Sequence, residues 1–164
     1  QRKVYRQSLV EFNYLLDYVP NWEKSYGRAG LIQYQTFIPL DTACDAYLEM
    51  LRLAQRRGMS PFLGVTKRHR PDKFLFTHAV DGYSFAMDFK VTSASKLQKL
   101  CEEMSDIALD AGGRFYFAKD STLTADRARR YLGDATLAKF HALKAQCDPD
   151  MLLQTDLYRR LLAR

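Results

Sequence analysis

The sequence has few of the features that mark membrane-spanning, disulfide-bonded or metal-binding proteins. No apolar run approaches the ~20 residues that a transmembrane helix needs, and no signal-peptide pattern stands at the N-terminus. The cysteines are odd in number and widely spaced, which argues against a disulfide framework or a zinc site: Cys44, Cys101 and Cys147. The histidines are scattered, without metal-ligand spacing: His69, His78 and His141. We therefore expect no bound metal, no transmembrane segment, and buried free thiols in a reducing compartment such as the cytoplasm.

Motifs that identify a common enzyme class are also missing. No Ser-His-Asp set, Gly-rich phosphate loop or paired-carboxylate motif is evident. What is present suits one globular domain, because 164 residues with 47% hydrophobic and 27% charged side chains can build a core. The net charge of +6 is compatible with an anionic ligand, a phosphate-bearing lipid or a nucleic acid, and equally with a basic surface that binds nothing.

Hydrophobic periodicity predicts strands and helices in a recognisable order. The expected elements are a strand over 31–38, a helix that Asp41 caps and Gly58 ends, strands over 62–68 and 83–91, a helix from 93 to 111, a strand from 114, and short C-terminal helices. Among the C-terminal leucines, Leu143 is expected to face inward and a last short helix is expected to carry Leu152 and Leu153. This β-α-β-β-α-β order predicts a ferredoxin-like α+β fold, an antiparallel sheet with helices on one face and extra C-terminal helices.

An antiparallel sheet covered on one face leaves the other face available to a ligand. Alternate residues of a strand share a face, so the pattern predicts that polar residues of two strands lie together on the uncovered face: Gln33, Gln35, Ser84, Ala86 and Asp88. Such a surface is either an ordinary solvated strand face or a hydrogen-bonding floor for a polyhydroxylated ligand. We favour the second interpretation because polar residues occupy alternate positions in two separate strands, and both sets are expected on the same face.

Two lysines are expected at the rim of that face. Gly112 and Gly113 end a helix, a short aromatic strand follows, and Tyr116 and Lys119 come at its end. A lysine at the tip of a strand either extends its charge into solvent or meets an anionic group, since an unpaired buried charge is costly. Lys67, toward the end of the strand 62–68, has the same two interpretations. Two such lysines favour an anionic ligand or developing negative charge.

RNA recognition is the main alternative. The order of elements is shared with RNA-recognition domains, the run 67–73 is basic, and the segment 82–87 is similar to their aromatic strand signature. Asp81 and Asp88 stand where that signature requires a basic and an aromatic residue, so Tyr83 and Phe85 are better interpreted as core. A non-catalytic ferredoxin-like module that binds RNA or another anion stays open, although no nucleic acid is expected.

Several short motifs resemble the C-terminal part of FAD-linked oxidases of the vanillyl-alcohol oxidase superfamily. They occur in the same order over most of the chain, from about Asn21 onward: Gly30-Leu31-Ile32-Gln33-Tyr34-Gln35, Met87-Asp88-Phe89, Ala118-Lys119-Asp120-Ser121, and Cys147-Asp148-Pro149 followed by Asp156. The sequence also departs from a characterised member of the family. Ser84 and Ala86 replace asparagine and cysteine, and Arg68 and His69 replace apolar residues.

The resemblance implies an FAD-dependent oxidoreductase whose FAD is bound mainly by a domain that precedes Gln1. Residues 1–29 would lead in from that domain, and residues 30–164 would form a substrate-binding, flavin-capping domain that is inactive alone. The expected reaction oxidises a secondary alcohol, on a sugar or a sugar-phosphate lipid, by hydride transfer to flavin. The resemblance implies Lys119 as the catalytic residue, Lys119 and Tyr116 as flavin contacts, and as substrate contacts Gln33, Gln35, Lys67, Ser84 and Tyr116.

Overall fold

The computed structural model describes residues 3–14 and 19–163. Its elements, in chain order, are α1 (Leu9–Asn13), the 3-10 helix η2 (Trp22–Tyr26), β1 (Leu31–Pro39), α2 (Leu40–Arg56), β2 (Leu63–His69), β3 (Gly82–Lys90), α3 (Ala94–Asp110), β4 (Arg114–Phe115), the 3-10 helix η3 (Phe117–Lys119), α4 (Ala125–Leu132), α5 (Asp134–Cys147) and the π-helix η4 (Tyr158–Leu162). From β1 to β4 the order of strands and helices is the predicted one. The α+β class is therefore confirmed.

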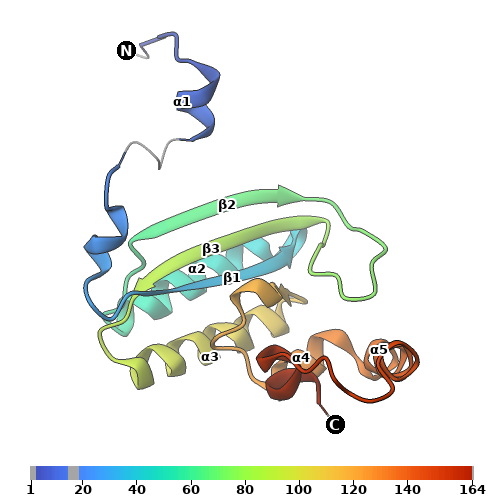
Figure 1. Ribbon diagram of the computed structural model, residues 1–164. Coiled ribbons are helices and arrows are strands. Elements are labelled where there is room, and N and C mark those ends of the chain that lie inside the picture. Colours follow the sequence, from blue (N-terminus) through green and yellow to red (C-terminus); the bar gives the residue numbers. More distant parts are fainter. Residues whose placement is uncertain (1–2, 15–18, 164) are drawn as a thin grey trace.

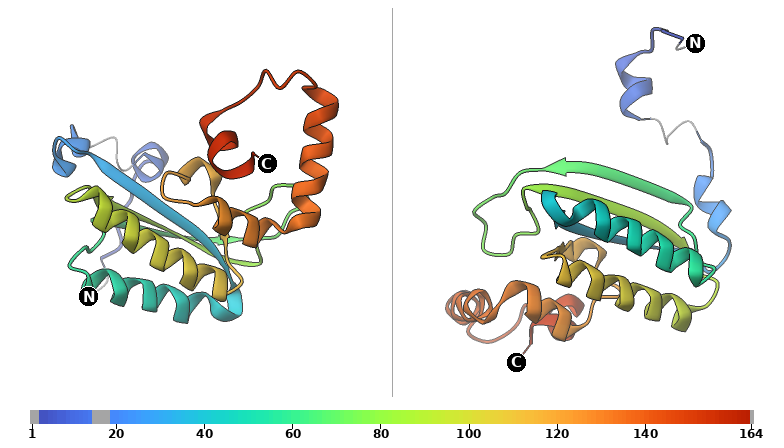
Figure 2. Two further views of the ribbon diagram at one scale, coloured as in Figure 1. Left: turned by 90° about the horizontal axis from the view of Figure 1, so that it is seen from below. Right: turned by 180° about the vertical axis from the view of Figure 1, so that it is seen from behind.

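One four-stranded antiparallel sheet organises the chain, with the strand order β2-β3-β1-β4. Strands β1 and β3 pair along their whole length, from Leu31 opposite Lys90 to Pro39 opposite Gly82. Strand β2 lies at one edge and pairs only with β3. Helices α2 and α3 run side by side across one face of the sheet (Figure 2). This arrangement leaves the opposite face, which we call the open face, without a covering helix from α2 or α3.

The hydrophobic core lies between the sheet and these two helices. Residues of β1 and β3 whose side chains share the helix-facing side meet the apolar stripes of α2 and α3, and the fully buried members include Ile38, Met50, Met87, Phe89, Leu97, Leu100 and Met104. Fully burying one such side chain stabilises the fold by about 1.5–3 kcal/mol. The Tyr47 hydroxyl lies 3.0 Å from Thr36 O and 2.8 Å from Tyr83 O, so it ties α2 to both central strands.

The end of α3 positions the short strand β4 beside β1. Gly112 has a φ of 73°, a left-handed conformation that side chains other than glycine adopt at a cost. The Gly113 N–H then donates to Ala108 O at 2.7 Å, which satisfies a carbonyl of the last turn. A Cβ at Gly113 would stand 2.6 Å from the same oxygen, so the turn has no space for a side chain. The chain consequently enters β4 next to the middle of the sheet.

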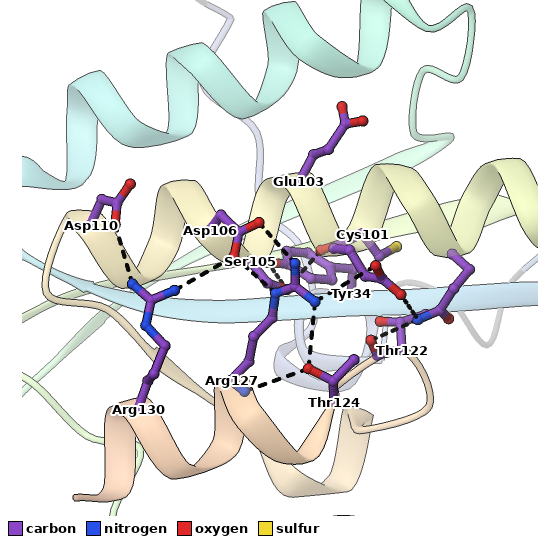
Figure 3. A network of polar contacts seen from close by, with 12 residues as sticks. Tyr34, Cys101, Glu103, Ser105, Asp106, Asp110, Thr122, Thr124, Arg127 and Arg130 are labelled. Carbon is purple, nitrogen blue, oxygen red and sulfur yellow. Dashed lines mark hydrogen bonds and ion pairs between the residues drawn. The ribbon is translucent and has the colours of Figure 1, made fainter.

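Helix α4 is fastened to α3 by an ion-pair network (Figure 3). Arg127 donates from Nε and Nη2 to the two oxygens of Asp106, at 2.9 and 2.8 Å, and its Nη1 lies 3.7 Å from Glu102. Arg130 reaches Asp106 and Asp110 at longer distances of 3.7 and 3.4 Å. Thr124 caps α4, since its hydroxyl accepts a hydrogen bond from Arg127 N. The C-terminal elements are thereby held against the central fold.

The structure corrects several predictions about local structure. Asp41 does not cap α2, because the helix begins at Leu40, two residues earlier than a cap at Asp41 requires, and Pro39 occupies the cap position without a side-chain hydrogen bond. The last strand is only two residues long, so Lys119 lies in η3 rather than at the tip of a strand. Only Cys101 is buried. Cys44 and Cys147 are exposed, since the inward stripe of α2 passes through Ala43 and Tyr47 instead.

The C-terminal leucines also differ from the prediction. Leu143, Leu152 and Leu153 are exposed, because α5 stands away from the sheet and the chain from 151 to 155 forms no helix (Figures 1 and 2). Near the other end of the chain, α1 has no buried residue and stands apart from the sheet, whereas Tyr26 of η2 is buried. Residues 1–2 and 15–18 of the expected lead-in segment lie outside the described residues. Among the residues that the structure describes, no helix has the length and apolar character needed to cross a membrane.

Candidate functional site

The register of the sheet brings the predicted polar residues onto the open face. Gln33 is opposite Asp88, and Gln35 is opposite Ala86. Ser84 lies between Phe37 on β1 and Lys67 on β2. Because alternate residues of a strand share a face, these residues all project from the side of the sheet that α2 and α3 do not cover. The shared face predicted for the two strands is therefore confirmed, and Lys67 is on it.

A buried carboxylate organises the end of the open face nearest η2. Asp88 is 3% exposed and accepts hydrogen bonds from Gln33 Nε2 at 2.7 Å and from the Tyr26 hydroxyl at 3.3 Å. Burial, followed by the charge and hydrogen bond of Asp88, raises the pKa of Tyr26, so this phenol stays protonated as a donor. Since Asp88 engages one N–H of the Gln33 amide and fixes its orientation, Gln33 can offer a ligand its acceptor, Oε1, and its second N–H.

An aromatic cluster covers the other end of the open face. The ring of Phe37 contacts those of His69, His78 and Tyr116, with centroid distances of 4.8, 4.5 and 6.2 Å, and His78 lies 4.8 Å from Tyr116. Beneath the cluster, Ser84 is fully buried and its Oγ lies 2.8 Å from His69 Nε2. The structure thus places Ser84 on the predicted face, but underneath His69.

The same cluster holds the long β2–β3 loop against the sheet. Arg114 of β4 donates from Nη1 to the carbonyls of Thr77 and Ala79, at 3.5 and 3.1 Å.

Burial, and then the nearby charges of His78, Lys67 and Arg68, lower the pKa of His69. Sequence reasoning assigned no role to His69, His78 or Arg114. His69 is two residues after Lys67 in β2, so the alternation of the strand could have placed His69 on the open face. His78 lies in a loop, where no such pattern indicates its position.

Polar groups without partners border the uncovered middle of the face. Within the described residues, the side chains of Gln35, Lys67 and Lys119 make no hydrogen bond or ion pair. Lys119 is half-buried at the end of η3, and η3 contacts β1. Tyr116 immediately precedes η3 and takes part in the aromatic cluster. The structure therefore brings Gln33, Gln35 and Lys67 to one face, with Tyr116 at its margin and Lys119 in the adjoining turn.

Other kinds of site find less support in this geometry. On β3, Tyr83 and Phe85 project from the side of the sheet that faces the helices. The ring of Phe85 packs against that of Tyr47 of α2, with 5.3 Å between the centroids. They are thus not available on the open face to stack with RNA bases, as RNA-recognition domains require. In the part of the chain that the structure describes, no group of three or more His, Cys, Asp or Glu is placed to hold a metal ion.

The fold and the face define a class of domain, an α+β domain with amide and ammonium groups on an uncovered sheet surface. The comparison with known proteins identifies a specific relative. The chain is 30% identical over 156 residues to decaprenylphosphoryl-beta-D-ribose oxidase of Mycolicibacterium smegmatis, and the match covers 94% of this chain and 33% of the relative. The sequence resemblance to an oxidase is thereby confirmed, and the chain spans about a third of that relative's length. No protein-family model matches the chain.

Proposed function

We propose that this chain is the substrate-binding, flavin-capping part of an FAD-dependent oxidoreductase. Its substrate is a secondary alcohol on a sugar or a sugar-phosphate lipid. The observation that carries the proposal is the extent of the similarity, because the 156 matched residues span 94% of the chain. A match of that extent takes in the open face as well as the core. The proposal therefore assigns the reaction to the whole protein and the recognition of its substrate to this sheet.

The residues of the open face suit a flavin and a polyhydroxylated substrate. Lys119 is a half-buried ammonium group without a counter-ion among the described residues, and such a group is stabilised by an anionic partner. A reduced flavin or a phosphate supplies the needed charge, and Tyr116 offers an aromatic surface beside it. When bound, FAD would accept the hydride released from the alcohol carbon, which carries both electrons of the oxidation. Lys119 and Tyr116 are the residues that would contact it.

Orientation of the substrate falls to the two glutamines and to Lys67. Gln33 offers a fixed acceptor, Oε1, to a sugar hydroxyl, because Asp88 holds its amide nitrogen at 2.7 Å. Gln35 has both a donor and an acceptor available. Lys67 is exposed on the same face and can bind a phosphate as a point charge. Holding the reacting hydroxyl in one orientation is a large part of what a protein contributes to such a reaction.

The role of Lys119 can be tested in the full-length oxidoreductase that contains this chain. Lys119→Ala should lower kcat by at least roughly 100-fold, the scale expected for removing one group that stabilises charge in a transition state. The matched control is Lys99→Ala, since Lys99 is an exposed lysine of α3, on the covered side of the sheet. Both variants should unfold at the wild-type temperature. Wild-type turnover in Lys119→Ala, with FAD bound, would reject the assigned role.

A further inference from the structure

The tip of the β2–β3 loop presents apolar side chains to solvent. Phe74 is 77% exposed and its neighbour Leu75 is also exposed, whereas the next residue, Phe76, is partly buried. The ring of Phe76 packs against those of Phe117 and Phe140, with centroid distances of 5.9 and 4.6 Å. The loop therefore buries one of its two phenylalanines and leaves the other projecting into solvent.

Hydrogen bonds hold the loop in the conformation that exposes Phe74. The Asp72 carboxylate accepts from Phe74 N at 3.0 Å, and Thr77 Oγ1 accepts from Ala79 N at 2.9 Å. Arg114 of β4 donates to the carbonyls of Thr77 and Ala79. Since the turns on both sides of Phe74 are fixed in this way, its exposure is a feature of the folded loop.

A second group of exposed apolar side chains lies at the same end of the molecule. Leu152 is 80% exposed, and Leu143 and Leu153 are exposed as well. Leu143, Leu153 and Phe76 line one cavity of about 430 Å³, so the C-terminal segment and the β2–β3 loop are neighbours there (Figures 1 and 2). Exposed apolar groups that gather in this way mark an interaction surface. We call the following side chains the apolar tip: Phe74, Leu75, Leu143, Leu152 and Leu153.

Unpaired cations flank the exposed phenylalanine. Arg70 and Lys73 are exposed and make no ion pair or side-chain hydrogen bond within the described residues. Lys67, near the end of β2, is a third exposed cation of this kind. Asp72, the carboxylate between Arg70 and Lys73, is engaged with the backbone N–H of Phe74. The loop thus combines an apolar projection with positive charge.

The C-terminal side of the apolar tip has a balanced charge. Lys144 and Asp148 form an ion pair at 2.7 Å. Of the other charged residues in this part of the chain, Lys139 and Asp150 are exposed and opposite in sign. This side therefore contributes apolar surface, and the loop contributes the positive charge.

We infer that the apolar tip docks on the surface of a membrane that contains anionic lipids. Phenylalanine and leucine side chains enter the boundary between head groups and acyl chains, and Arg70 and Lys73 are placed to meet the lipid phosphates there. Phe74 and Leu152 project outward instead of lining the cavity, a shape that suits insertion into lipid better than a fit to a folded partner. The inference does not depend on the proposed function.

Flotation of the full-length protein with lipid vesicles provides the test. Vesicles of phosphatidylcholine are compared with vesicles that also contain roughly 30% phosphatidylglycerol, an anionic lipid. The protein should float with the anionic vesicles and should bind the neutral ones at least roughly tenfold more weakly, because each cation near an anionic surface contributes to binding. Raising the salt concentration to about 0.5 M should weaken binding, since it screens this attraction.

Two variants and two matched controls locate the contact. Phe74→Ser should weaken binding to anionic vesicles roughly tenfold, as expected when one apolar side chain is no longer removed from water. Phe62→Ser should not, because Phe62 is an exposed phenylalanine at the other end of β2. Lys73→Gln should weaken binding roughly fivefold, whereas Lys99→Gln, at an exposed lysine of α3, should have no such effect. All four side chains are exposed, so the unfolding temperatures should equal that of the wild type.

Three outcomes would overturn the inference. One is the absence of flotation with anionic vesicles at low salt. The second is an equal loss of binding in Phe74→Ser and Phe62→Ser, which would mean that the attraction is not localised at the loop. The third is self-association without lipid that Phe74→Ser abolishes in analytical ultracentrifugation, which would assign the apolar tip to a second copy of the chain. The vesicles contain no sugar and the assay involves no oxidation, so its failure is distinguishable from that of the proposed reaction.

Discussion

Arg160 is bonded to Asp120, the residue that directly follows Lys119. Its Nη2 donates to the Asp120 carboxylate at 2.6 Å, and its Nη1 donates to the carbonyls of Asp120 and Leu123 at 3.3 Å each. A residue near the C-terminus thus anchors the turn that presents the candidate catalytic lysine. Because small displacements of a reacting group are costly to catalysis, we interpret Arg160 as a positioning residue.

We expect Arg160→Ala to lower kcat of the full-length enzyme by roughly tenfold or more through misplacement of Lys119. Arg159→Ala is the matched control, because Arg159 is exposed and reaches only Gln154, at 3.5 Å. Both kcat and the unfolding temperature should be measured. Arg160→Lys, which keeps a charge at that position, should recover part of the activity. Equal kcat values for the two alanine variants would remove the positioning role.

The Gln33–Asp88 pair predicts effects on both stability and substrate affinity. Asp88→Ala frees the Gln33 amide and removes an acceptor from two buried donors, which should cost about 1–3 kcal/mol of unfolding free energy. Gln33→Ala should raise KM for a sugar alcohol and should also lower the unfolding free energy, because the buried Asp88 carboxylate loses its shortest hydrogen bond. Urea denaturation and steady-state kinetics measure the two effects. An unaltered KM in Gln33→Ala would show that Gln33 does not contact the substrate.

The two arginines of α4 form a natural comparison of ion pairs. Arg127 is 18% exposed and makes a bidentate hydrogen bond to the Asp106 carboxylate. Arg130 is 54% exposed, and its contacts with Asp106 and Asp110 are longer. Asp106 is itself 47% exposed, so solvent screening weakens both pairs. We expect Arg127→Met to lower the free energy of unfolding by about 1 kcal/mol and Arg130→Met by about 0.3 kcal/mol or less. High salt should reduce the difference, which denaturant titrations with and without salt would reveal.

His69 predicts how stability depends on pH. Its pKa in the folded protein is lowered, chiefly by burial, so below about pH 6.5 the unfolded chain binds a proton more readily than the folded one. The stabilising contribution of the neutral His69 to the free energy of unfolding should therefore be fully present above about pH 6.5 and decrease as the pH falls through the lowered pKa of His69. His69→Gln should flatten this part of the profile. A slope identical to wild type over that interval would assign the pH dependence to other groups.

The acidic residues with lowered pKa values act in the same direction but at lower pH. Asp106, whose pKa is lowered chiefly by its hydrogen bond with Arg127, loses its stabilising charge only below about pH 4, near the ordinary value for an aspartate. Measurements between about pH 7.5 and 5 therefore avoid the titration of Asp106, and the comparison with His69→Gln separates His69 from the other histidines.

Much of the sheet could be predicted because strand parity is a local property. The alternation in 31–38 and 83–91 assigns each side chain to a face before any partner strand is known, so Gln33, Gln35 and Asp88 were placed correctly. The predicted role of each site residue stays a prediction. The burial of Ser84 could not be anticipated, because it depends on the β2–β3 loop folding back so that His78 and His69 pack on Phe37.

The errors have a common physical origin in tertiary context. Phe115, Tyr116 and Phe117 have high strand propensity, yet the pairing with β1 ends after Phe115 and the chain turns into η3. Apolar periodicity also identified the C-terminal leucines as hydrophobic without indicating what they face. Leu153 lies at a cavity instead of in a core, a difference that depends on how far α5 stands from the sheet.

The edge position of β2 has a consequence for how the protein behaves at high concentration. An outer strand exposes a row of backbone donors and acceptors that can recruit a strand from another molecule. Lys67 makes no ion pair among the described residues, whereas its neighbour Arg68 is paired with Asp81, so one uncompensated positive charge lies at this margin. Two copies that approached edge to edge would bring two such charges together. This repulsion disfavours self-association through the edge of β2.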